Sequence, residues 1–72
     1  MTYAITLLDR TCTAQRCWVG YHTKRQAISE AKKLVTADLP AAEVYRCLGN
    51  GLDPEDVAFV YRHITKVTVS LY

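Results

Sequence analysis

The segment from Thr23 to Val35 constrains the fold more than any other part of the chain, because it combines a helix start signal with helical periodicity. Thr23 can accept a hydrogen bond from a free amide of the first turn, and Gln26 can reach back to Thr23 in a capping box. Apolar and polar residues then separate at helical spacing, with Ala27, Ile28, Ala31, Leu34 and Val35 opposite Lys24, Arg25, Ser29, Lys32 and Lys33. The pattern predicts an amphipathic helix that packs on a sheet.

Segments with the two-residue period of half-buried strands lie on both sides of this helix. Before it, Tyr3–Leu8 and Arg16–His22 alternate across a polar, basic loop, which predicts an antiparallel hairpin. Gly20 in the second strand marks a bulge or a close approach of a neighbouring group. After the helix, Lys66–Tyr72 alternates, with its valines and its leucine pointing inward. This last strand either lies inside the sheet or presents an open edge to another chain.

The stretch 38–64 fits two structures. As helices, 41–48 would follow a proline and stop at a glycine, and 53–62 would begin with Asp-Pro-Glu-Asp, whose acidic residues suit a helix start. As strands, Glu43–Leu48 and Val57–His63 would form a hairpin around a Gly-Asn-Gly turn. Periodicity cannot separate these alternatives in such short runs. The acidic start favours helix for 53–62, and helix is slightly favoured for 41–48.

These elements predict a single α+β domain over residues 1–72. We expect a small antiparallel sheet, formed by the N-terminal hairpin and the C-terminal strand, packed against one long helix, with one or two short helices or a second hairpin in 41–62. Seventy-two residues, 50% of them hydrophobic, supply one modest core and favour a binding surface over a deep pocket. The chain shows no secretory signal and no apolar run long enough to cross a bilayer, so we expect a cytoplasmic protein without membrane contact.

The net charge of +2 conceals an uneven distribution. Residues 1–36 contain six basic and two acidic residues, a net +4, whereas residues 37–72 contain three basic and five acidic residues, a net −2. A basic first half is typical of proteins that bind a negatively charged partner. The acidic second half, however, lowers the overall positive charge below that of most nucleic-acid-binding domains.

No group of residues in the sequence has the spacing of a catalytic, cofactor or metal site. Cys12, Cys17 and Cys47 are too irregularly spaced for a zinc site and odd in number for a disulfide framework. The acidic residues of 53–56 are explained by a helix start, and no glycine-rich phosphate loop is present. We therefore expect no catalytic residue, no cofactor and no metal, and hence a protein that is not an enzyme.

Basic and aromatic residues of the first half, together with the C-terminal tyrosine, are the candidate partner-binding residues. Aromatic rings among basic residues are typical of single-strand nucleic-acid binding, and tyrosine, tryptophan and arginine also dominate protein-protein interfaces. The candidates are Arg10, Arg16, Trp18, Tyr21, Lys24, Arg25 and Tyr72.

The stretch 18–35, Trp-Val-Gly-Tyr-His-Thr-Lys-Arg-Gln-Ala-Ile-Ser-Glu-Ala-Lys-Lys-Leu-Val, resembles the strand-into-helix core of small phage- and prophage-encoded accessory proteins. Some of those families are inhibitors of host defence of the anti-CRISPR type. The resemblance implies a protein that acts by occupying a partner's surface, and it carries over no site residue. We expect a non-catalytic protein that docks on another macromolecule, as a phage-type inhibitor does, with a protein as its partner. The alternative is a nucleic-acid-binding module that uses the basic N-terminal hairpin and the helix start. The C-terminal strand also offers a route to a homodimer.

Overall fold

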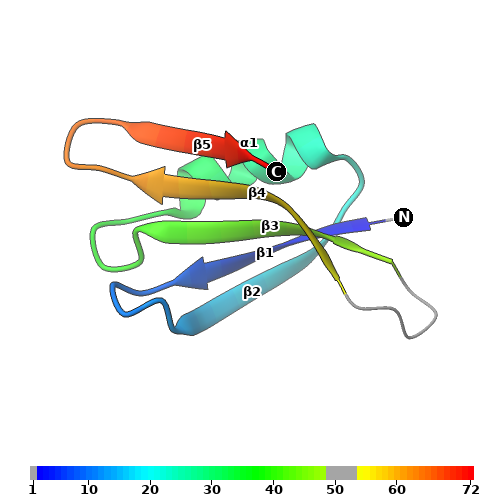
Figure 1. Cartoon of the computed structure of the whole chain (residues 1–72), viewed down its shortest axis with the longest axis horizontal. Coiled ribbons are helices and arrows are strands. Elements are labelled where there is room, and N and C mark those ends of the chain that lie inside the picture. The colour runs from blue at the N-terminus through cyan, green and yellow to red at the C-terminus, as the bar shows by residue number, and fades with distance from the viewer. Residues whose placement is uncertain (1, 49–53) are drawn as a thin grey trace.

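The computed structural model of the chain describes residues 2–48 and 54–72, which form a five-stranded antiparallel sheet with one helix packed on one face (Figure 1). The strand order across the sheet is β2-β1-β3-β4-β5. The α+β class is confirmed, but the sheet is larger than the expected sheet of a hairpin and one further strand. In chain order the elements are β1 (Thr2–Leu8), β2 (Ala14–Tyr21), α1 (Lys24–Leu34), β3 (Ala41–Cys47), β4 (Glu55–Arg62) and β5 (Val67–Leu71).

Three of the connections between elements lie at one end of the sheet. β2 and β3 run in the same direction with β1 between them, and α1 links them across one face. The β1–β2 loop (9–13), the α1–β3 connection (35–40) and the β4–β5 loop (63–66) therefore lie together at the end opposite the two termini (Figure 1). We call this end the loop end.

The helix begins as its sequence predicts. The Thr23 Oγ1 accepts a hydrogen bond from the Gln26 amide at 3.1 Å. The Gln26 side chain reaches back, but it accepts from the His22 amide at 3.2 Å, one residue earlier than the expected bond to Thr23. The predicted apolar stripe is also confirmed, because Ala27 and Ala31 are fully buried against the sheet.

The core lies between α1 and one face of the sheet. Ile5, Val44 and Ala58 are direct partners on β1, β3 and β4, and each is fully buried. Alanines on both the helix and the strands let the two layers approach closely, so small volume changes there are felt directly. The buried members of this cluster are Ile5, Leu7, Ala27, Ala31, Val35, Ala42, Val44, Val57, Ala58 and Val60.

The expectation of helices in 41–62 is wrong, and the hairpin alternative is correct. β3 pairs with β4 from Ala41 opposite Tyr61 to Arg46 opposite Glu55. The apolar stripe of α1 needs a sheet wide enough to cover it. The N-terminal hairpin alone is too small to be stable, and β3 and β4 supply the further strands. The β-branched and aromatic residues of 57–61 favour a strand inside the sheet over a short isolated helix. The Asp53 start signal and the Gly49-Asn50-Gly51 turn lie outside the described residues.

Gly20 marks a bulge, which changes the faces of β2. Its φ is +94°, and the register slips between Tyr3 opposite Tyr21 and Ile5 opposite Trp18. A Cβ at this glycine would meet nothing within 4 Å, so its backbone conformation and not a close neighbour requires glycine. The extra residue places Trp18 and Tyr21 on the same face, where both pack against the core. The strict alternation expected for 16–22 is therefore wrong beyond Trp18.

β5 is an edge strand. Among the described strands it pairs only with β4, so the expectation of an open edge is confirmed and an interior position is excluded. Val67 and Val69 pack against the core as expected, but Leu71 is 65% exposed.

Candidate functional site

The face of the sheet opposite α1 carries a group of aromatic and polar side chains. Residues directly opposite on neighbouring strands share a face, and successive residues alternate between faces. The register thus sets Cys17, Thr6, Glu43 and Phe59 in one row across β2, β1, β3 and β4. The same side bears Ala4, Leu8, Ala41, Tyr45, Asp56 and Tyr61. We call this surface the open face, because no other described element packs on it.

Tyr45 holds the middle of the open face in place. Its hydroxyl accepts a hydrogen bond from Thr6 Oγ1 at 3.2 Å and lies 3.2 Å from Cys17 Sγ. Burial raises the pKa of Tyr45 above its ordinary value, and the Cys17 thiol adds to the rise. The phenol therefore stays protonated and ties three strands together with a polar contact at the surface.

The open face is negatively charged along its strands. Glu43 and Asp56 lie on it, whereas the register puts no lysine or arginine of the described strands there. Arg46 belongs to the opposite face, 3.7 Å from Glu55 and with its guanidinium 5.9 Å from the Tyr3 ring centre. Glu43 is half-buried and makes no hydrogen bond or ion pair within residues 2–48 and 54–72.

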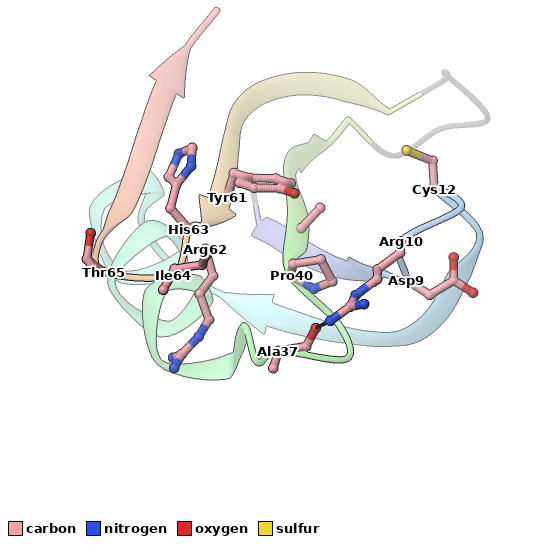
Figure 2. A pocket seen from close by; sticks show the side chains of 11 residues that line it. Asp9, Arg10, Cys12, Ala37, Pro40, Tyr61, Arg62, His63, Ile64 and Thr65 are labelled. Atoms are coloured by element: carbon pink, nitrogen blue, oxygen red, sulfur yellow. Dashed lines mark hydrogen bonds between the residues drawn. The ribbon is translucent and has the colours of Figure 1, made fainter.

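A hollow of about 780 Å³ opens where the open face meets the loop end (Figure 2). Its floor is formed by Pro40 and Ala41, which are buried, and one wall by the Tyr61 ring. Arg10 and Cys12 lie on the other side, as Figure 2 shows. The further lining residues are Asp9, Ala37, Arg62, His63, Ile64 and Thr65.

Aromatic rings continue from this wall along β4. The Phe59 and Tyr61 rings stack with centres 6.4 Å apart, and His63 meets Tyr61 edge-on at 5.0 Å. His63 Nε2 is 3.0 Å from Thr68 Oγ1, which anchors the imidazole to β5. The Tyr61 ring is therefore supported from both sides while remaining 39% exposed.

The β1–β2 loop is organised around the carboxylate of Asp9. Asp9 Oδ1 accepts from the Thr11 hydroxyl at 2.6 Å, the Thr11 amide at 2.9 Å and the Thr13 amide at 3.0 Å, and Oδ2 accepts from Gln15 at 2.8 Å. These bonds, led by that of the Thr11 hydroxyl, lower the pKa of Asp9 to about 2. Cys12 adopts a left-handed conformation with φ 62°, which few residues other than glycine take. The loop is thus shaped by its own hydrogen bonds before any ligand is present.

Arg10 is positioned at the hollow without a carboxylate partner. Its guanidinium donates to the Ala37 carbonyl at 3.3 Å, which links two of the three connections. The ion pairs among the described residues are Lys33 with Glu30 and Arg46 with Glu55, so neither Arg10 nor Arg62 is paired. The loop end as a whole carries more basic than acidic side chains, with Arg10, Lys32, Lys33, Arg62 and Lys66 against Asp9, Asp38 and the Glu30 that pairs with Lys33.

The structure separates the residues that the sequence proposed as partner-binding. Arg10 lies at the loop end, while Lys24 and Arg25 lie in the first turn of α1 at the other end of the sheet. Arg16, opposite Leu7, faces the helix side on an edge strand. Tyr72 is 71% exposed after β5, also away from the loop end. With Trp18 and Tyr21 packed against the core, the seven residues form no single surface.

The aromatic and acidic residues of the open face were missed because 53–62 was expected to be a helix. In a helix, Val60 and Tyr61 would share one apolar stripe. In the strand they point to opposite faces, so Val60 is fully buried and Tyr61 is exposed. A two-residue period in Ala58, Val60 and Arg62 against Phe59, Tyr61 and His63 is the signal that identifies this surface.

The cysteines lie apart. Cys12 is in the β1–β2 loop, Cys17 is on the open face and Cys47 ends β3 at the other end of the sheet. Within the described ranges, no three side chains of histidine, cysteine, aspartate or glutamate are close enough to hold a metal ion. The acidic residues 55 and 56 lie on β4, not at a helix start, so the explanation from the helix dipole is wrong.

Comparison of the chain with protein-family models, with curated proteins and with solved structures finds no match. In the part of the chain that the structure describes, no helix is long and apolar enough to cross a membrane.

Proposed function

We propose that this protein is a non-catalytic binding protein that docks on another protein through its open face. The observation that carries the proposal is the Glu43 carboxylate, which is half-buried at the centre of this face and pairs with no other described residue, with Phe59 on one side and Thr6 on the other. A charge in such surroundings gains most when a partner excludes water and supplies the opposite charge.

The charge of the open face supports a protein partner over a nucleic acid at this surface. Glu43 and Asp56 repel phosphate, and the described strands bring no basic residue to the face to offset them. Tyr45 and Phe59 are of the residue types that form the buried centre of protein interfaces. The partner surface that fits is apolar and contains one lysine or arginine that pairs with Glu43.

The distance between two groups of basic residues disfavours the nucleic-acid alternative. It used the basic hairpin together with the helix start, but β2 separates these two groups over eight residues, about 25 Å at roughly 3.3 Å per residue. A phage-type inhibitor of a host defence complex is one kind of protein that would act by docking, and it stays a prediction.

A photo-crosslinking residue placed at position 59 tests the docking proposal. In extracts of cells that encode the protein, we expect Phe59 replaced by benzoylphenylalanine to give one crosslinked protein, and the same replacement at Ser29, exposed on α1, to give none. The crosslink should be lost in Glu43→Lys and kept in Arg25→Glu. Equal crosslinking from both positions, or a crosslink to nucleic acid, would rule out docking through the open face.

A second surface supports self-association. β5 leaves its outer backbone groups unpaired, and Leu71 and Tyr72 are 65% and 71% exposed beside it. Antiparallel pairing of β5 with β5 of a second copy would cover these side chains. The mass in solution, measured over a range of concentrations, tests this mode, and a monomer at millimolar concentration would exclude it.

A further inference from the structure

The hollow at the loop end is chemically different from the rest of the open face. The centre of that face is acidic, whereas the hollow is lined by two arginines, Arg10 and Arg62, and by one carboxylate, that of Asp9. Its volume of about 780 Å³ falls in the range of pockets that hold small ligands. The hollow is therefore a candidate site for a separate ligand, one that carries negative charge.

The two sides of the hollow present complementary chemical groups. Tyr61 offers an exposed ring face, stiffened by Phe59 and His63. Arg10 lies on the other side of the hollow, in the β1–β2 loop, with one of its five N–H donors directed to the Ala37 carbonyl (Figure 2). A planar ring stacks on the first group, and a phosphate or carboxylate pairs with the second.

The neighbouring carboxylate forms no ion pair with Arg10. Asp9 lines the hollow, but both of its oxygens accept hydrogen bonds within the β1–β2 loop, and no ion pair joins it to Arg10. Arg62 also lines the hollow, so two guanidinium groups border it, and neither has an ion-pair partner among the described residues. An anionic ligand restores the missing partner.

We propose that the hollow is a nucleotide-binding site in which the base stacks on Tyr61 and the phosphate pairs with Arg10. A nucleotide carries both a planar ring and an anionic group, one for each side of the hollow. The surface beyond Tyr61 turns acidic at Glu43, so the hollow accommodates one nucleotide and not a long strand. The nucleotide comes either free or as the end of a single strand.

Titrations followed by amide chemical shifts test the site on the whole chain. We expect adenosine 5′-monophosphate to shift the amides of Arg10, Ala41 and Tyr61, and adenosine without phosphate to bind about tenfold more weakly. An eight-residue single strand of dA that binds more tightly than the mononucleotide identifies a strand end as the source. Equal affinities identify the free nucleotide.

Matched variants separate the site from general charge attraction. Arg10→Gln should weaken the mononucleotide about tenfold, whereas Arg25→Gln, which removes the same charge at the far end, should leave binding unchanged. Tyr61→Leu should weaken it similarly, and Tyr61→Phe, which keeps the ring, should restore binding. Well-dispersed amide spectra establish that each variant is folded.

Three outcomes would overturn the proposal. The first is no shift with millimolar mononucleotide, and the second is equal weakening by Arg10→Gln and Arg25→Gln. The third is tighter binding of an acidic peptide such as Glu-Tyr-Glu-Glu at the same amides, which would make the hollow part of a protein interface. None of these outcomes bears on crosslinking at Phe59, so the docking proposal and the nucleotide site are tested separately.

Discussion

Truncation of Val44 to alanine measures how much of the stability comes from the layer between α1 and the sheet. Val44 is fully buried on the central strand β3, directly between Ile5 on β1 and Ala58 on β4. The change removes two methyl groups, worth about 1.6 kcal/mol at roughly 0.8 kcal/mol each. The cavity left between packed alanines cannot close fully and raises the expected loss to about 2–3 kcal/mol.

Leu71 is the matched control, because the sequence pattern assigns it an inward position as well. Its side chain is 65% exposed, so Leu71→Ala removes little buried surface and lowers the free energy of unfolding by less than about 1 kcal/mol. A chain of 72 residues loses roughly 4–8 °C in melting temperature per kcal/mol. We expect Val44→Ala to melt about 10–20 °C below the wild type and Leu71→Ala within about 6 °C of it.

Thermal and urea unfolding followed by circular dichroism give both values. The reasoning is refuted if Val44→Ala loses less than about 1 kcal/mol, since a fully buried valine cannot be removed so cheaply from a packed core. A loss at Leu71 as large as that at Val44 would also contradict it. That result, if it depended on protein concentration, would instead indicate that β5 is covered by a second copy.

Substitutions at three further positions have defined outcomes. Thr23→Ala removes the acceptor for the first-turn amide and should lower the free energy of unfolding in urea by about 1 kcal/mol. Gly20→Ala should lose about 1 kcal/mol or more from its φ of +94°, and Gly20→Asn, which tolerates positive φ better, should lose less; equal stability of all three would refute the strain. The pKa of Asp9 is about 2 in the folded protein and 3.8 as a model value, so its ionised form stabilises the fold above about pH 4 and that contribution is lost as the pH falls through 2. Asp9→Asn should therefore flatten the pH dependence of unfolding between pH 4 and 2, and an unchanged slope would show that the loop does not hold the carboxylate.

The two proposed surfaces follow from one feature of the fold, which is that a single helix covers a single face of the sheet. The other face keeps its aromatic residues accessible, and the end where three connections meet carries Arg10 and Arg62, which form no ion pair with other described residues. Glu43 and Arg10 thus mark two chemically opposite sites on one small domain. The site at Glu43 selects a partner with positive charge, and the site at Arg10 selects a ligand with negative charge.

Local signals in the sequence identified the helix, its cap, the N-terminal hairpin and the strand nature of 67–71. Each of these depends on neighbours a few residues away, such as Thr23 and Gln26, so the sequence carries the necessary information. The bulge at Gly20 was also visible as an exception within a strand. Its effect on the faces of Trp18 and Tyr21 was not, because it depends on the pairing with β1.

The candidate site depended on contacts that local patterns do not contain. The charges of the two halves of the chain suggested a molecule with one basic and one acidic side. Folding interleaves the two halves, since β3 from the second half lies beside β1 from the first. Arg10 and Tyr61 are 51 positions apart in the chain and line the same hollow only because the β1–β2 and β4–β5 connections share one end.

By itself the sequence determined the amphipathic helix, the alternating strands beside it and the α+β class, since each follows from residue types at short spacing. Only the tertiary structure decided that 41–47 and 55–62 are strands, because a short apolar run fits both the helical and the strand period. Pairing with the neighbouring strands, and the width of sheet that α1 needs, determine the structure of such a run. That choice turned Phe59 and Tyr61 outward and brought Glu43 to the centre of the open face. The surface on which the proposed functions depend is therefore a product of strand pairing across the whole chain.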